Sequence, residues 1–88
     1  MILPPNIKSM YDNAFYEFDG VEVEIPTKVT SIPSNCFAYS KLEKVVIPNS
    51  VTSILSNAFA HCANLKDVIL SNALTSIDTN AFTYCESL

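Results

Sequence analysis

A pattern of 22 or 23 residues is repeated along this 88-residue chain. Phenylalanine marks the pattern four times, asparagine stands two residues before each phenylalanine, and several apolar residues recur at the same interval. The resulting columns are Phe15, Phe37, Phe59 and Phe82; Asn13, Asn35, Asn57 and Asn80; Leu3, Ile25, Ile47 and Leu70; and Met10, Ile32, Ile54 and Ile77. A fixed period of this length is typical of a solenoid, in which each repeat forms one coil and stacks on the next. We therefore expect a repeat solenoid and not a closed globule.

The repeat divides a single domain of residues 1–88 into four coils, at 1–22, 23–44, 45–67 and 68–88. The first coil is irregular, because Phe18 stands in the column of Cys62 and Gly20 in that of Leu42. Terminal repeats are often atypical because they act as caps, so we expect residues 1–22 to be a partial cap. No capping pattern follows the last coil, where Phe82 and Leu88 would be open to water. We expect a fragment of a longer array, or end-to-end association with a second copy.

A short β-strand is predicted around Val45. Alternate residues of a strand point to opposite faces, so Val45 and Ile47 share the inner face, and Lys44 and Val46 lie on the other. Pro48 has no amide hydrogen to donate and therefore ends the strand. Equivalent strands of successive coils run in the same direction, which predicts a parallel sheet along one side of the solenoid.

The opposite side of each coil is predicted to hold a helical turn. Residues 51–54 cross to this side, and Ser56 then follows in a column of residues that favour a helix N-cap. That column is Asp12, Ser34, Ser56 and Thr79. Ala58, Phe59 and Cys62 share one face at helical spacing. The expected fold is therefore an α/β repeat solenoid, with a short parallel β-sheet on one side and short helical turns on the other.

The charge and the lack of long apolar runs exclude several classes of partner. The net charge is −4, and the chain contains no arginine. Binding of nucleic acid depends on clustered cations, so no nucleic-acid partner is expected, and an acidic surface is not attracted to anionic membranes. No stretch approaches the roughly 20 apolar residues of a membrane span, which predicts no membrane insertion in this chain. Residues 1–5 lack the basic start and long apolar run of a signal peptide.

No arrangement of residues suited to catalysis is found in the sequence. Serines and threonines recur at structural positions, and no serine–histidine–aspartate set, phosphate-binding glycine loop or pair of carboxylates converges. A set of four zinc ligands is also missing. The sequence therefore predicts a protein that is not an enzyme and has no catalytic residues, no metal site and no cofactor.

Two cysteines and the single histidine are interpreted as packing residues. Cys62 and Cys85 share a column at a spacing of about 5 Å, which permits a disulfide, but stacked parallel side chains suit one poorly. We interpret both as small buried thiols. His61 shares a column with Tyr39 and Tyr84, so we expect its ring to stack between theirs.

The exposed face of the strand sheet is the candidate ligand-binding surface. Two columns of outward-pointing residues cross it: Glu22, Lys44 and Asp67 form the first, and Glu24, Val46 and Ile69 form the second. The first column can form a charge ladder across strands, and the second contains a small apolar patch. Solenoids commonly bind partners through such a surface. The alternative is that these charges and β-branched residues only favour the strand conformation.

The recurring pattern Leu-x-x-Val-x-Ile-Pro-x-x-Val-Thr-x-Ile…Ala-Phe-x-x-Cys resembles the leucine-rich repeats of the BspA type, closely over residues 23–88 and loosely over 1–22. The resemblance implies a right-handed leucine-rich-repeat coil. It also implies an interaction module, because such repeats occur in bacterial and protozoan surface proteins associated with adhesion to host proteins and other cells. We therefore expect an extracellular or cell-surface protein with a protein partner, such as a host extracellular-matrix or cell-surface protein.

Two departures from this expectation leave questions open. Other leucine-rich repeats carry an asparagine or cysteine ladder three residues after the last apolar strand residue, where this chain has Asn6, Lys28, Ser50 and Ala73, so no such ladder is expected. We hypothesise that the column of Asn57 bonds the backbone at the opposite corner instead. Unoxidised cysteines and the missing export signal favour the alternative function, an intracellular, cytoplasmic structural or scaffolding repeat array.

Overall fold

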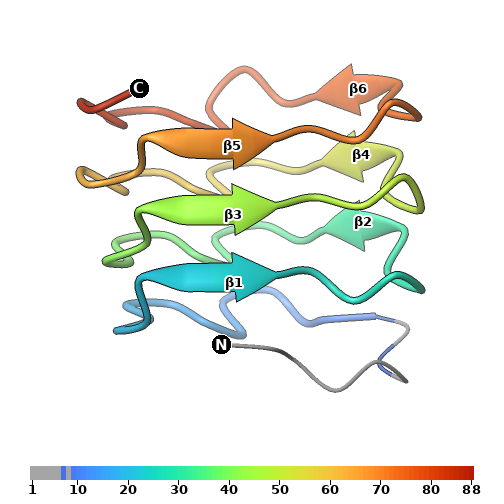
Figure 1. Cartoon of the computed structure of the whole chain (residues 1–88), viewed down its shortest axis with the longest axis horizontal. Helices are drawn as coiled ribbons and strands as arrows, with labels where there is room; N and C mark the ends of the chain where they lie inside the picture. The colour runs from blue at the N-terminus through green and yellow to red at the C-terminus, as the bar shows by residue number, and fades with distance from the viewer. Residues whose placement is uncertain (1–6, 8) are drawn as a thin grey trace.

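Stacked coils form the computed structural model of the protein, which describes residues 7 and 9–88 (Figure 1). The strands are β1 (Glu22–Glu24), β2 (Ser31–Ile32), β3 (Lys44–Val46), β4 (Ser53–Ile54), β5 (Asp67–Ile69) and β6 (Ser76–Ile77). They form two three-stranded parallel sheets, ordered β1-β3-β5 and β2-β4-β6. The structure thus confirms a repeat solenoid with short parallel strands.

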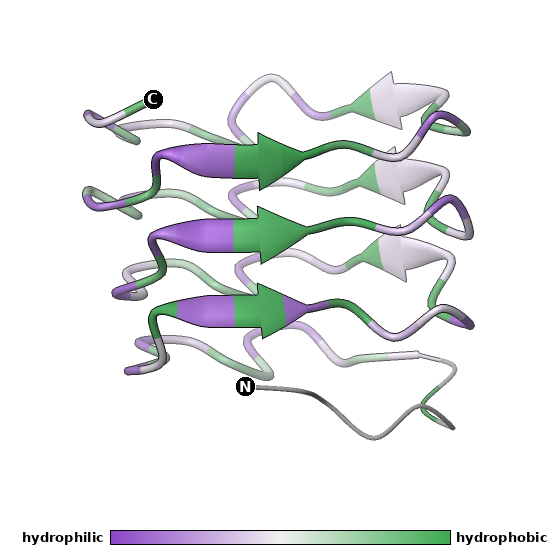
Figure 2. Ribbon diagram, viewed as in Figure 1, coloured by the Kyte–Doolittle hydropathy of each residue, from purple (hydrophilic) through white to green (hydrophobic). Residues whose placement is uncertain are grey.

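The register of both sheets pairs equivalent residues of successive coils. Val23 pairs with Val45 and Val45 with Val68, so each inward-pointing residue of this sheet lies beside its counterpart. In Figure 2, β3 and β5 begin with a hydrophilic residue and continue with hydrophobic ones. The second sheet lies where the sequence predicted only a crossing segment, since Ser53 and Ile54 pair in parallel with both neighbouring coils. Sheet pairing therefore holds two sides of the coil.

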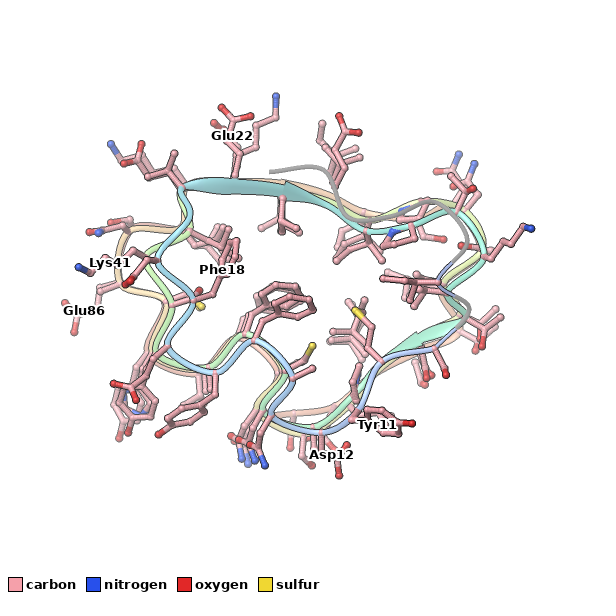
Figure 3. All side chains as sticks on the ribbon, turned by 90° about the horizontal axis from the view of Figure 1, so that it is seen from below. Tyr11, Asp12, Phe18, Glu22, Lys41 and Glu86 are labelled. Carbon is pink, nitrogen blue, oxygen red and sulfur yellow. The ribbon has the colours of Figure 1, made fainter. Side chains whose placement is uncertain are left out.

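The core consists of columns of similar side chains that run along the stack. Figure 3 looks along this direction and shows the side chains of successive coils superposed. Phe37 and Phe59 are fully buried, and their rings stack with centroids 5.4 Å apart and planes 3° apart. Phe15 and Phe82 extend the column at 5.2 Å on either end. Burial of each fully enclosed ring contributes about 1.5–3 kcal/mol, so this column is a principal source of stability.

The expected helical turns are not present among the described residues, and consecutive β-turns take their place. Three amides of one coil donate to the carbonyl three residues earlier, namely Ala58, Ala60 and Cys62. Between them, Phe59 N–H donates to the carbonyl of Ala81, and His61 N–H donates to that of Thr83, both over 2.8 Å. Every second amide thus bonds the next coil, whereas an α-helix would direct all of its amides along its own axis.

Backbone conformation explains why the chain turns here. Asn57 has a φ of 57° and His61 a φ of 60°, both in the left-handed region that interrupts a right-handed helix. A residue with positive φ is required at the third position of a type II turn, and asparagine tolerates it better than most residues. Ser56, expected at a helix N-cap, precedes Asn57 within such a turn. Among the described residues, the side-chain amide of Asn57 forms no hydrogen bond with the backbone, so the hypothesised ladder is not found there.

A steric exchange explains the irregular first coil. A Cβ atom on Gly20 would lie 2.5 Å from Cζ of Phe18, so no larger residue fits beside this ring. Phe18 packs edge-on against Phe15 at 5.8 Å and against Phe37 at 6.0 Å. The large side chain of Phe18 thus replaces the leucine that later coils carry as Leu42, Leu65 and Leu88.

Candidate interaction surfaces

The six residues predicted to bind a ligand lie in two adjacent columns on the outer face of sheet β1-β3-β5. In the first column Glu22 pairs with Lys44 and Lys44 with Asp67, and in the second Glu24, Val46 and Ile69 pair in the same order. The structure therefore brings together both sets of neighbours that the alternation of residues predicted. We call these six residues the sheet face.

The sheet face combines alternating charge with a small apolar area. Lys44 is half-buried between two acidic residues, and opposite charges directly across a sheet contribute about 0.2–1 kcal/mol per pair. Val46 is half-buried, whereas Ile69 is 52% exposed. No pocket is found among residues 7 and 9–88.

A second surface feature is a column of rings on the turn side of the coil, in which three tyrosines are exposed and one histidine is half-buried. Tyr39 and His61 stack with centroids 4.3 Å apart and planes 7° apart, and His61 and Tyr84 stack at 4.6 Å and 22°. The predicted position of His61 between two tyrosines is therefore confirmed. Tyr16 extends the group, tilted by 53° at 5.6 Å from Tyr39. We call these four residues the aromatic column.

The backbone of the aromatic column is in an unusual conformation. Tyr39, His61 and Tyr84 have φ values of 59–60°, and Glu17, at the equivalent position of the first coil, has a φ of 60°. Bulky residues with positive φ are rare, because Cβ approaches the following carbonyl oxygen. Glycine or asparagine would fit this position with less strain, as asparagine does one turn earlier. The rings are thus placed at a conformational cost.

Comparison with known protein families identifies the repeat. Residues 1–88 match the family described as BspA type leucine rich repeat region (6 copies). The chain belongs to the BspA-type leucine-rich repeat family. The solved structure of a leucine-rich cell surface protein from Faecalibacterium prausnitzii A2-165 is similar to this BspA-type chain, with a TM-score of 0.80 and 22% sequence identity. The match covers all of this chain but only 30% of that protein, so this chain spans about a third of that protein's length. The likeness shows that the two share a fold over this part. A search of curated proteins gives no match.

The three cysteines of this BspA-type repeat are free thiols that bond the backbone or pack in the core. Cys62 Sγ donates to the carbonyl oxygen of Phe37 over 3.1 Å, and Cys85 Sγ donates to that of Phe59 over 3.0 Å. Contact with Cys62, together with burial, raises the pKa of Cys85. Burial raises the pKa of Cys36 to about 12. Cys36 and Cys62 are fully buried, as predicted for Cys62. Cys85 was predicted to be buried as well, but it is only half-buried, because no further coil of this chain covers it.

Neither a metal site nor a membrane-spanning helix is found in the part of the chain that the structure describes. No group of three or more histidine, cysteine or acidic side chains there is arranged to hold a metal ion. No helix in the same part is long and apolar enough to cross a bilayer.

Proposed function

We propose that this BspA-type repeat is a non-catalytic protein-interaction module of a surface-exposed protein, in which the sheet face contacts a protein partner. The observation that supports the proposal most strongly is the register of the sheet face, which aligns charged and apolar residues of three coils on one surface without a pocket. Solenoids commonly bind through such continuous surfaces. Repeats of this family are typically not enzymes, which agrees with this role.

The cell-surface location is part of the proposal and is supported by the likeness to a leucine-rich cell surface protein. Adhesion to a host extracellular-matrix or cell-surface protein is the role that fits this location. Because the repeat spans 30% of that relative, the flanking parts of the parent protein are expected to carry the determinants of export and anchoring.

The experiment uses the intact parent protein and a panel of purified host matrix proteins. Val46→Asp combined with Ile69→Asp adds two charges to the apolar part of the sheet face, and is expected to abolish binding without unfolding the repeat. The matched control, Leu55→Asp with Ala63→Asp, adds two charges at exposed positions outside the sheet face and is expected to bind normally. Equal affinity of both double variants and the wild type would exclude the sheet face as the binding site.

The second candidate function is an intracellular structural or scaffolding array, supported by the three unoxidised cysteines. Thiols persist in reducing compartments, whereas exported proteins generally oxidise accessible pairs. Labelling of intact cells with a membrane-impermeant reagent separates the candidates, since only a surface protein is modified.

End-to-end self-association is a related proposal. Leu70, Ile77 and Leu88 are exposed together on the last coil, which gives an apolar rim that an adjoining coil or a second copy would cover. Sedimentation of this 88-residue chain over a range of concentrations tests contact between copies, and a monomer throughout would contradict it.

A further inference from the structure

At the first coil, Tyr39 has a stacked ring on only one of its two faces among the described residues. His61 covers one face of Tyr39, at 4.3 Å and 7°. On the other side, the first-coil position equivalent to Tyr39 holds Glu17 and not an aromatic residue: Glu17 N–H donates to the carbonyl of Ala38, as Tyr39 N–H donates to that of Ala60 one coil later. Tyr16 approaches Tyr39 from the neighbouring position only at a tilt of 53°. Tyr39 therefore remains 51% exposed, beside a tilted ring and a carboxylate.

The carboxylate at this position is available to a partner. Glu17 is exposed, and its side chain forms no ion pair or hydrogen bond with any described residue. The nearby carboxylate of Asp19 is already paired with Lys41 Nζ at 3.8 Å. A cation near Tyr39 would be attracted both by the negative face of the ring and by the charge of Glu17.

The shape of the opening favours a guanidinium group over an ammonium group. A guanidinium is planar, stacks on ring faces and presents several donors to one carboxylate, whereas a lysine ammonium is a compact, strongly hydrated charge. The chain contains no arginine, so another molecule must supply this group. The net charge of −4 favours a basic partner as well.

We propose that Tyr16, Glu17 and Tyr39 form a docking site for an arginine side chain of a partner protein. The guanidinium stacks on the open face of Tyr39, its N–H groups donate to the Glu17 carboxylate, and Tyr16 packs against its edge. The remaining rings of the aromatic column provide rigid amphipathic contact area around this anchor, as tyrosines do in many protein-binding surfaces. This site lies on the turn segments that precede β1 and β3, outside the strands that carry the sheet face. In Figure 3, Lys41 from such a segment and Glu22 of the sheet face point away from different sides of the coil.

The test uses two capped peptides of equal charge, tri-arginine and tri-lysine, added to the 88-residue chain and followed by NMR of the tyrosine and histidine ring protons. We expect tri-arginine to shift the rings of Tyr16 and Tyr39 and to bind more tightly than tri-lysine. Tyr39→Leu and Glu17→Gln are each expected to weaken tri-arginine binding by about two- to fivefold, the range for an exposed cation–π or ion-pair contact. Glu86→Gln, which removes the same charge from an exposed position of the last coil, is the matched control and should leave the affinity unchanged.

Three results would overturn the proposal. Equal affinity for the two peptides would mean that only net charge is recognised. A loss in Glu86→Gln as large as in Glu17→Gln would mean that the acidic surface binds without a defined site. Absence of ring shifts at saturating peptide would exclude the site. Glu17→Gln keeps the test decisive if Tyr39→Leu does not fold, and neither variant alters the sheet face, so this outcome is independent of the function proposed above.

Discussion

Substitutions in the phenylalanine column test whether each coil interacts only with its immediate neighbours. Phe37 stacks on Phe59 at 5.4 Å and Phe59 on Phe82 at 5.2 Å, so Phe37 and Phe82 are separated by a complete coil. In a double-mutant cycle, we expect Phe37→Leu and Phe59→Leu to be coupled by about 0.5–1.5 kcal/mol, the value of an aromatic pair beyond its burial. Phe37→Leu and Phe82→Leu are expected to add within about 0.3–0.5 kcal/mol.

Leucine is used instead of alanine in these variants because the total free energy of unfolding is small. At about 0.05–0.15 kcal/mol per residue, a chain of 88 residues has a free energy of unfolding of roughly 4–13 kcal/mol. A buried Phe→Ala change costs about 3–5 kcal/mol, so two such changes would remove a large part or all of this free energy. Phe→Leu retains most of the apolar volume and costs on the order of 1–2 kcal/mol.

Urea unfolding supplies the assay, with an unchanged slope as evidence that all variants share the same unfolding transition. Coupling between Phe37 and Phe82 as large as that between Phe37 and Phe59 would refute the nearest-neighbour reasoning. So would the absence of coupling between Phe37 and Phe59.

Three further predictions concern the turns, the thiols and the first coil. Asn57→Gly should change the free energy of unfolding by only a few tenths of a kcal/mol, whereas Asn57→Val should lose about 1–2 kcal/mol because of the positive φ; equal losses would contradict the role of φ. Cys36→Ala should be nearly neutral at pH 7, because alanine fills the same column at Ala14, Ala58 and Ala81. Since folding raises the pKa of Cys36 from 9.0 to about 12, its contribution to stability is complete below pH 9 and is lost as the pH rises towards 12. The urea midpoint should therefore fall less steeply in this variant between pH 8 and 11. Phe18→Cys should restore the thermal stability that Gly20→Leu alone removes, because the smaller side chain vacates the space that leucine needs.

The sequence predicted the stacking of the coils because each column repeats its chemistry. Val23, Val45 and Val68 had to fall in register if like residues lie over like, and the paired strands place them so. The alternation of inward and outward residues around Val45 also placed the sheet face correctly on one surface. Both results depend only on the length of the repeat and on the alternation of inward and outward residues in a strand, and the sequence shows both directly.

The helical turns could not be distinguished from β-turns by the same reasoning. Ala58, Phe59 and Cys62 point inward, which fits one face of a helix. The same three residues also point inward when the segment forms two successive β-turns. The deciding information lay in Asn57, since an asparagine that recurs at the same place in each coil is a signal for positive φ. No such signal marks His61, whose residue type is not a strong turn former. Hydrogen bonding to the next coil imposes its conformation.

Tyr16 was missed for a related reason. Column counting places Glu17, and not Tyr16, at the position equivalent to Tyr39. The ring reaches Tyr39 only because a long side chain leans across from the neighbouring position, at a tilt of 53°. Contacts that cross from one column to another depend on rotamers, which the repeat period does not determine.

In the aromatic column, the cost of positive φ and the gain from ring contacts are of similar size. Each bulky residue held at positive φ costs about 1–2 kcal/mol, and each ring pair returns about 0.5–1.5 kcal/mol. Three strained aromatic residues and three ring contacts therefore come close to balance. Asparagine or glycine at Tyr39, His61 and Tyr84 would leave the fold about equally stable. Stability does not decide the choice of residue at these positions, so recognition of a partner by the exposed rings can decide it at little cost to the solenoid.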